Sequence, residues 1–388
     1  MTANTKGHAV VIGGGIIGLA TCFEFQDAGF KVTLIDPDPI SGATHHAGGM
    51  LAPTAEVQYQ QQALVPLMKE SAQLYPDLIQ RVGQHTDLPT GYRTEGTVLI
   101  GADRADAQHL AELIDYIKAE DLDIEPLTTR QARQLEPALS PRIAKAATID
   151  GDHQLDPRLF ARALFDAVLA RGAQHVRETV SAITEATESA SHQSVTLSSG
   201  ARIEVDSSDV IVLAAGLGAA KITGWFEGEH PLQLRPVYGD VLRVRVPESL
   251  QPLTTRVIRG FVEDRPIYVI PRDDGTVTIG ATSREDQPHP RTSAIHDLLR
   301  DAIRVVPGLE ETEFLEATCG ARPGTPDDLP YLGQVRDNLI VSTGYFRHGI
   351  LLAALGARTA VQLATGQDTS PAIKPCAPFR YATSTLNV

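Results

Sequence analysis

A glycine-rich turn between a strand and a helix constrains the fold of this 388-residue chain more than any other feature. Residues 8–12 form a strand pattern, apolar and largely β-branched after His8, and Gly13-Gly14-Gly15-Ile16-Ile17-Gly18 follows directly. A helical pattern comes next, and residues 31–35 predict a second strand that ends at Asp36. The sequence therefore predicts a βαβ unit of the Rossmann type.

Each element of this unit has a role in binding a dinucleotide. Gly13 permits the tight turn, Gly15 lets the backbone approach a pyrophosphate, and Gly18 lets the helix pack close to the strand. The N-terminus of the helix favours an anion because free N–H groups and the positive end of the helix dipole meet there. Asp36, 18 residues after Gly18, is expected to accept hydrogen bonds from a ribose 2′-hydroxyl, which disfavours NADP.

Composition disfavours nucleic-acid and membrane partners. The chain is 42% hydrophobic and 21% charged, as in soluble globular proteins, and its net charge of −14 comes without a basic stripe. The late apolar stretch 349–364 contains Arg358 and is too short to span a membrane. The cysteines, Cys22, Cys319 and Cys376, lack metal-ligand spacing and fit a reducing cytosol. We expect no metal site, no signal peptide and a cytoplasmic location.

Periodicity predicts two domains, each built from more than one segment of the chain. The class is α/β (α+β overall): a Rossmann-like domain of residues 1–84, 149–224 and 325–388, and an inserted antiparallel-sheet substrate domain of residues 85–148 and 225–324. Helices are expected at 63–83 and 158–171, and a hairpin turn at Asp274-Gly275. The polar stretch 185–194 predicts a surface loop.

Two further blocks are of interest for cofactor binding. The dense run of small residues in GATHHAGGMLAP, residues 42–53, lets the backbone approach a flat ring system; the alternative is a flexible loop. The block TGYFRHGILL, residues 343–352, predicts a second turn into a helix, whose N-terminus would stabilise negative charge on a cofactor. An ordinary core helix is the alternative interpretation of that block.

Four ordered blocks resemble the D-amino-acid-oxidase-like flavoprotein family, and within it the glycine oxidases of thiamine biosynthesis. They are GGGIIG, GATHHAGGMLAP, GARPGTPDDLPYLG and TGYFRHGILLA. Weaker matches lie between them: LDP at 155–157, VLAAG at 212–216, RPVYGD at 235–240 and YVIPR at 268–272. The resemblance covers nearly the whole chain.

The resemblance implies non-covalent FAD rather than NAD. The implied cofactor-binding residues come from the glycine-rich turn, the acidic strand end, the two further blocks and one isolated position beside the adenine. They are Gly13, Gly15, Ile16, Ile17, Gly18, Asp36, Pro37, Ala43, Thr44, Gly48, Gly49, Met50, Val180, Tyr345, Phe346, Arg347, His348, Gly349, Ile350 and Leu351.

The resemblance also implies residues that bind an amino-acid carboxylate. A carboxylate in an apolar pocket is costly unless a fixed cation meets it, and the planar fork of arginine makes two hydrogen bonds to it. Arg322 matches the family's carboxylate arginine, Arg347 a second arginine near the substrate, and Tyr268 a hydroxyl donor to the same carboxylate. Surface salt bridges are the alternative role for such arginines.

Three positions depart from the family. His45 and His46 replace small residues, and we expect them to contribute backbone while their rings face solvent, rather than to tune the flavin. Ser283 stands where glycine oxidases often have methionine, which predicts a wider pocket. Cys319 lies one residue before the position of covalent flavin attachment in some sarcosine oxidases, so we expect no covalent bond.

The resemblance implies oxidative deamination of glycine or another small amino acid, with dioxygen as acceptor, to give imine or oxoacid, ammonia and hydrogen peroxide. With glycine, the imine would feed thiamine thiazole synthesis. The alternatives are a D-amino-acid dehydrogenase, a sarcosine-type oxidase, a tRNA-modifying flavoenzyme and a non-catalytic flavin-binding subunit. A homo-oligomer is common in the family, although no residue here indicates one.

Overall fold

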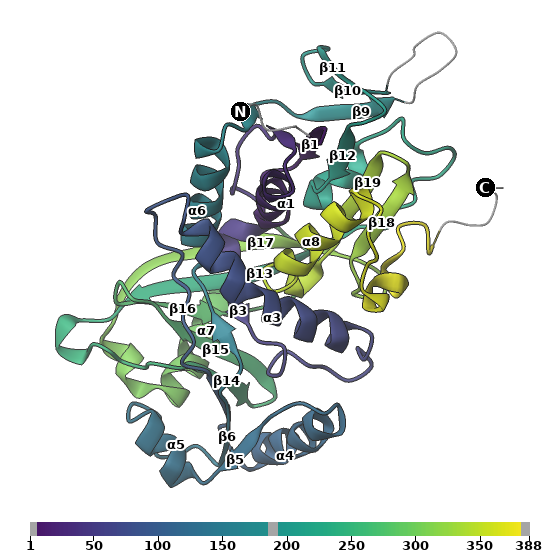
Figure 1. Cartoon of the computed structure of the whole chain (residues 1–388). Coiled ribbons are helices and arrows are strands. Elements are labelled where there is room, and N and C mark those ends of the chain that lie inside the picture. The colour runs from purple at the N-terminus through teal and green to yellow at the C-terminus, as the bar shows by residue number, and fades with distance from the viewer. Residues whose placement is uncertain (1–5, 185–192, 382–388) are drawn as a thin grey trace.

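The structure is a computed structural model that describes residues 6–184 and 193–381. Its first sheet has six strands in the order β18-β19-β12-β1-β2-β8 (Figure 1). These strands are Tyr331–Arg336, Leu339–Thr343, Val210–Leu213, His8–Ile12, Lys31–Ile35 and Gln174–Val176. All neighbours are parallel except β18 and β19, which pair antiparallel.

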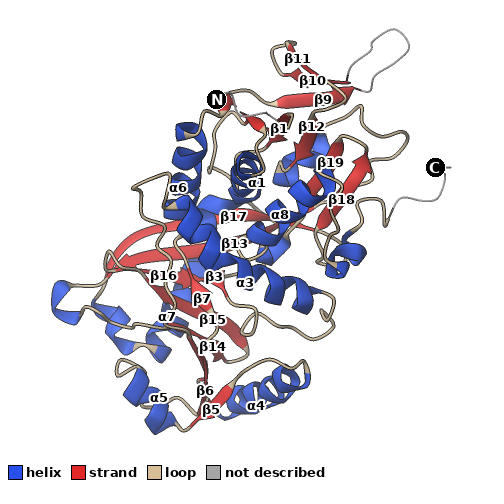
Figure 2. Ribbon diagram, in the orientation of Figure 1, coloured by secondary structure: helices blue, strands red, loops and turns tan. Residues whose placement is uncertain are grey.

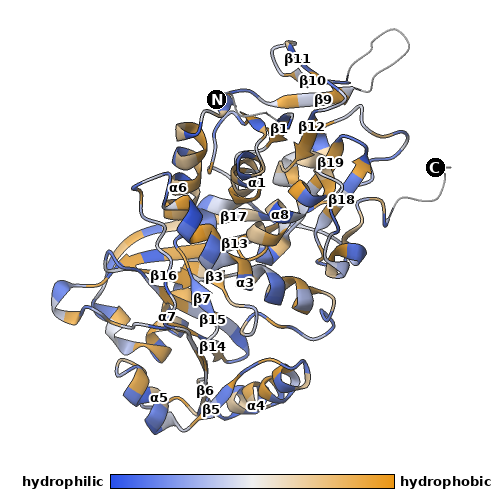
Figure 3. Ribbon diagram, viewed as in Figure 1, coloured by the Kyte–Doolittle hydropathy of each residue, from blue (hydrophilic) through white to orange (hydrophobic). Residues whose placement is uncertain are grey.

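Both faces of this sheet are covered, which explains its continuous apolar strands. On one face, Ala9 and Val11 of β1 belong to the same core as the helices α1 (Ile16–Asp27), α3 (Leu64–Val82), α6 (Pro157–Ala170) and α8 (Ala353–Ala364). On the other, Val10 and Ile12 pack in a core with the small sheet of β9 (Val180–Thr184), β10 (Gln193–Leu197) and β11 (Arg202–Val205). Figure 2 shows this layering, and Figure 3 the apolar colour of β12.

The second sheet has eight strands in the order β17-β13-β16-β15-β14-β4-β6-β5. They are Glu313–Gly324, Arg235–Arg245, Thr276–Gly280, Arg265–Pro271, Val257–Val262, Thr97–Gly101, Lys145–Ile149 and Glu125–Leu127. The long strands β13 and β17 extend from this sheet toward the six-stranded one (Figure 1). Helix α7 (Thr292–Val305) shares its apolar core, while α4 (Arg104–Ala119) and α5 (Thr129–Leu135) lie at its far end.

The remaining elements are short. Helix α2 (Ala43–His46) leads into β3 (Met50–Leu51), which pairs with β7 (His153–Gln154). Turns of 3-10 helix cover Gly216–Lys221, Glu248–Leu250, Pro307–Glu311, Phe346–His348 and Pro371–Cys376. In the part of the chain that the structure describes, no helix combines the length and apolar character needed to cross a membrane.

The predicted fold class and several local predictions are confirmed. Helices α3 and α6 occupy the expected ranges, and the Asp156 side chain caps α6 by accepting from the N–H groups of Arg158 and Leu159. The turn at Asp274-Gly275 joins the antiparallel pair β15 and β16. The domain boundaries stay a prediction, although the strands of each sheet come from the segments assigned to it, apart from Ile149 at the end of β6.

Three local predictions need correction. The second sheet is mixed, because β14 pairs parallel with β4, which enters from the segment before the main insertion. Helix α8 begins at Ala353, since residues Phe346–His348 form a tighter 3-10 turn first. Gln193 and Ser194 begin β10 rather than extending a loop, and 185–192 lie outside the described residues.

The core that supports the first sheet gives a stability prediction. Phe160 of α6 is fully buried against Tyr75 of α3, with ring centroids 6.1 Å apart. Phe160→Ala should lower the free energy of unfolding by about 3–5 kcal/mol, because it removes buried area and leaves a cavity. Phe314→Ala is the control, since Phe314 is 50% exposed and should change stability by less than about 1 kcal/mol. Urea titration would measure both; equal effects would contradict this account of the core.

Candidate cofactor and substrate site

A cavity of about 640 Å³ lies between the two sheets. It is lined by the carboxyl ends of the parallel strands of the first sheet and by residues 239 of β13, 266–268 of β15 and 319–323 of β17. Its volume is in the range of ligand-binding pockets. One wall comes from the first sheet and the segments after its strands; the opposite wall comes from the second sheet. The first-sheet wall contains Gly13, Gly15, Ile16, Ile17, residues 36–38 and 40–44, residues 46–50, residues 214–218 and residues 342–351.

The β1–α1 turn fits the pyrophosphate of a dinucleotide. Gly13 has φ +112°, and a Cβ there would lie 2.5 Å from the carbonyl oxygen of Ala214, so only glycine allows this approach. A Cβ at Gly18 would lie 1.8 Å from the carbonyl oxygen of Gly13, which explains the close packing of α1. The first turn of α1 carries no acidic side chain that would repel an anion.

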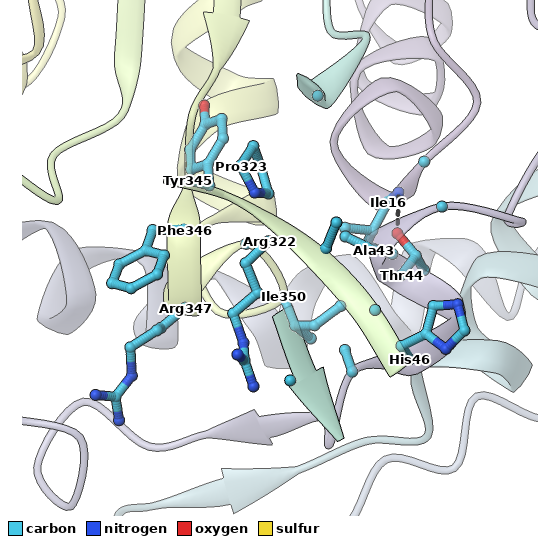
Figure 4. A pocket seen from close by; sticks show the side chains of 18 of the residues that line it. Ile16, Ala43, Thr44, His46, Arg322, Pro323, Tyr345, Phe346, Arg347 and Ile350 are labelled. Atoms are coloured by element: carbon cyan, nitrogen blue, oxygen red, sulfur yellow. Dashed lines mark hydrogen bonds between the residues drawn. The ribbon is translucent and has the colours of Figure 1, made fainter. Parts of the chain in front are cut away.

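The neighbouring polar groups stabilise this turn. The Thr44 hydroxyl accepts a hydrogen bond from the Ile16 N–H at 3.0 Å (Figure 4). The Asp36 carboxylate accepts from the N–H groups of Gly14 at 2.6 Å and Asp38 at 2.8 Å. Asp36 lines the cavity, and its carboxylate has further lone pairs with which it would accept from a ribose hydroxyl.

The small-residue loop after β2 is held in place from outside the cavity. The Arg272 guanidinium, buried at the end of β15, donates to the carbonyl of Gly48 and to that of Leu155, the latter at 2.8 Å. Arg158 and Arg243 donate to the His45 carbonyl at 2.9 and 3.2 Å. The loop is therefore a fixed wall of the cavity rather than a flexible segment.

The second turn, before α8, has an equally defined conformation. Gly344 has φ +74°, and a Cβ there would lie 2.7 Å from the Thr325 side chain. The buried Tyr345 hydroxyl lies 2.9 Å from the Ser342 hydroxyl, and burial raises its pKa. Phe346 and Arg347 then project into the cavity (Figure 4).

Arg322 and Tyr268 form the polar centre of the second-sheet wall. Each lies over a strand neighbour that has no side chain: a Cβ at Gly239 would lie 2.3 Å from Nη2 of Arg322, and a Cβ at Gly280 would lie 2.3 Å from the Tyr268 hydroxyl. Arg322 Nη1 donates to the Thr282 carbonyl at 3.2 Å. Within the described residues, Arg322 makes no ion pair.

Burial affects the two groups differently. Burial lowers the pKa of Arg322, but the usual pKa of arginine is so high that the guanidinium stays charged. Burial raises the pKa of Tyr268, so its hydroxyl stays protonated and can donate a hydrogen bond. The pair presents one positive charge and one donor to the same space. Such an arrangement binds a carboxylate.

Sequence reasoning missed two charged residues of the cavity, Glu56 and Arg259. The Glu56 carboxylate accepts from Arg259 and, at 3.2 Å, from Nη2 of Arg347. Neither residue stands in a recognisable block, because Glu56 follows the small-residue loop and Arg259 lies in an otherwise apolar strand. The one signal in the sequence is Arg259 itself, a single charged residue in the otherwise apolar run 257–262.

Most of the residues predicted for the site line this one cavity. The exceptions are Gly18 and Val180. Gly18 lies within α1, and the side chain of Val180, the first residue of β9, is buried in the core that β9 shares with the first sheet. His46 lines the cavity, which corrects the expectation that its ring faces solvent; its short helix packs against β17. Burial, with His45 next in importance, lowers the pKa of His46 to about 4, so the ring is neutral at pH 7.

Ser283 and Cys319 also line the cavity. Burial raises the pKa of the Cys319 thiol to about 11, and its sulfur lies 3.3 Å from the Arg284 guanidinium, which donates to it. A protonated thiol is a poor nucleophile. Among the described residues, no group of three or more His, Cys, Asp or Glu side chains is arranged to hold a metal ion.

Comparison with known proteins identifies the family. Residues 8–363 match the DAO family, described as FAD dependent oxidoreductase. A bifunctional ThiO/ThiG protein of Synechocystis sp. is 33% identical over 98% of this chain and 55% of its own length. A glycine oxidase of Geobacillus kaustophilus is 29% identical over 96% of each chain. The crystal structure of glycine oxidase from that organism superposes with a TM-score of 0.85, at 28% identity over 97% of this chain and 99% of the other.

The chain therefore belongs to the DAO family of FAD-dependent oxidoreductases, as the four motifs predicted. It spans about half the length of the bifunctional relatives that it matches. The glycine cradle, the positive end of α1, whose N-cap residue Gly15 has no side chain, and Asp36 fit FAD, whose pyrophosphate and ribose need these groups.

The role of Asp36 can be tested through FAD affinity. Asp36→Ala should weaken FAD binding about 10- to 100-fold, because hydrogen bonds to a charged group are worth about 1.5–3 kcal/mol. Flavin fluorescence during titration of the apoprotein would give the dissociation constant. Asp123→Ala, at an exposed position away from the cavity, is the control. An unchanged constant in the Asp36 variant would remove Asp36 from the FAD site.

Proposed function

We propose that this protein oxidises a small amino acid, with glycine as the first candidate, using non-covalently bound FAD and dioxygen. The products are the oxoacid, ammonia and hydrogen peroxide, and the intermediate imine would supply thiamine thiazole synthesis. The observation that carries the proposal is the half-buried, charged Arg322, which lines the cavity together with the Tyr268 hydroxyl. The names of the relatives support the substrate class.

The residues of the second-sheet wall would orient the substrate. Arg322 and Tyr268 bind the carboxylate, so the Cα–H bond takes a fixed direction in the cavity. The glycines beneath them, Gly239 and Gly280, keep both side chains flat on the sheet and leave room for the substrate above. FAD, when bound, supplies the acceptor for the two electrons, and dioxygen regenerates it.

We assign no side chain as a proton-abstracting base. Glu56 is paired with Arg259 and Arg347, and burial lowers the pKa of His348 to about 4, which makes its ring a weak base. The amino acid reacts with its amine neutral. Water then converts the imine to the oxoacid and ammonia.

The proposal is tested by mixing the FAD-loaded protein with glycine, sarcosine and D-alanine separately without oxygen. Bleaching of the flavin band, followed by hydrogen peroxide when air is admitted, is expected with at least one of them, and the rates rank the substrates. Bleaching that reverses only with a quinone or dye would indicate a dehydrogenase. A flavin that none of the three reduces would contradict the proposed function.

Loss of the carboxylate-binding cation should be severe. Arg322→Met is expected to lower kcat/KM about 100- to 1000-fold, because a buried carboxylate left without its charged partner costs about 2–5 kcal/mol. Steady-state peroxide production measures this, and FAD affinity should stay unchanged. Arg245→Met, at an exposed position on β13, is the matched control. A loss below about fivefold would remove Arg322 from the carboxylate site.

The glycine beneath Arg322 gives an independent test of the same position. In Gly239→Ala, the added methyl group would overlap the guanidinium and push it away from the sheet. KM should rise about tenfold while FAD affinity is retained, since a displaced group loses geometry that substrate binding requires. Identical KM values for the variant and the natural protein would contradict the arrangement of Arg322 over Gly239.

A further inference from the structure

We propose that Glu56 is a specificity-determining residue that selects amino acids with one carboxylate over those with a second acidic group. This inference rests on the proposed function. Three guanidinium groups line the described part of the cavity, those of Arg259, Arg322 and Arg347. Glu56 engages two of them and leaves Arg322 as the guanidinium that receives a carboxylate.

The contacts of Glu56 divide the cationic groups into two sets. Its Oε1 accepts from Arg259, and its Oε2 accepts from Nη2 of Arg347 at 3.2 Å. With its oxygen turned toward the guanidinium, the Gln58 amide accepts from Arg347 as well, at 3.2 Å from Nη2. The segment 56–58 therefore holds Arg347 through two side chains, those of Glu56 and Gln58, and holds Arg259 through Glu56.

The segment that carries Glu56 is itself fixed by a second buried carboxylate. The two oxygens of Asp152, which is fully buried, accept from the N–H groups of Thr54 at 3.1 Å and Ala55 at 2.9 Å. The Glu56 N–H donates to the Ala52 carbonyl at 3.2 Å. The Glu56 side chain, 8% exposed, thus enters the cavity from a rigid turn.

The electrostatic setting keeps Glu56 ionised. Burial favours the neutral acid, but the charges of Arg259 and Arg347 outweigh burial and hold the pKa of Glu56 below its usual range. A second acidic group on a substrate would have to approach this carboxylate. Both guanidinium groups on that side already pair with Glu56, and two like charges at close range repel each other.

The side chains of Arg322 and Arg347 point toward the same side of the pocket (Figure 4). This geometry defines the competing arrangement, in which Arg347 leaves Glu56 and shares a single carboxylate with Arg322. The two arrangements respond differently to the loss of the Glu56 charge. In our proposal only a second acidic group gains a partner, whereas in the competing one a single carboxylate gains affinity too.

The test uses the FAD-loaded protein and two non-reacting acids, acetate and malonate, with binding followed by perturbation of the flavin absorption band. For Glu56→Gln we expect malonate to bind at least tenfold more tightly than to the natural protein, while acetate affinity changes less than threefold. Glu263→Gln is the matched control, because Glu263 also bridges two arginines, Arg265 at 3.0 Å and Arg304 at 2.8 Å, but outside the cavity. Its malonate-to-acetate ratio should equal that of the natural protein.

A parallel gain for acetate and malonate in Glu56→Gln would overturn the proposal and assign Arg347 to the single carboxylate. Arg259→Gln provides a second test that does not depend on the folding of the first variant. This substitution removes a cation while Glu56 keeps its charge. Malonate affinity, relative to acetate affinity, should therefore fall at least fivefold. An unchanged malonate-to-acetate ratio would overturn the proposal. Absence of amino-acid turnover would contradict the proposed function alone, because neither titration uses turnover.

Discussion

The close approach of the β1–α1 turn to the end of β12 determines where a dinucleotide can lie in this protein. With a Cβ at Gly13 only 2.5 Å from the Ala214 carbonyl oxygen, no other residue type fits there. The six-stranded sheet places the segments after β1, β2, β12 and β19 at one edge, as expected for the carboxyl ends of parallel strands. The cofactor cavity forms at this edge, and the long strands β13 and β17 close it from the other side.

The substrate half of the cavity depends on how buried charges are paired. Arginines are stable in such surroundings only when carboxylates, carbonyls or ligands meet them. Arg272 donates to loop carbonyls, and Arg259 and Arg347 pair with Glu56, so each has a structural partner. Arg322 has one carbonyl and lies beside the Tyr268 hydroxyl. The distribution of partners, rather than the number of arginines, indicates which of them meets the substrate.

The sequence was sufficient for the features that depend on local patterns. The glycine turn, the Asp156 cap of α6 and the Asp274-Gly275 hairpin each depend on backbone requirements of a few residues. The ordered motifs also led to Arg322 and Tyr268. Glu56 and Arg259 could not be found, because their meaning lies in a contact between positions 203 residues apart. The parallel pairing of β14 with β4 escaped prediction for the same reason, since it joins distant segments. The ring of His46 was misplaced because burial of a neutral histidine leaves no sequence signal.

The central claim is that Arg322 and Tyr268 receive the substrate carboxylate while Glu56 retains Arg259 and Arg347. The most direct measurement is a crystal structure of the FAD-loaded protein with glycolate, a non-amine analogue of glycine. The account predicts carboxylate oxygens about 2.7–3.2 Å from the Arg322 guanidinium and the Tyr268 hydroxyl, with both arginines still on Glu56. A carboxylate bound to Arg347 that has separated from Glu56, or bound away from Arg322, would contradict it.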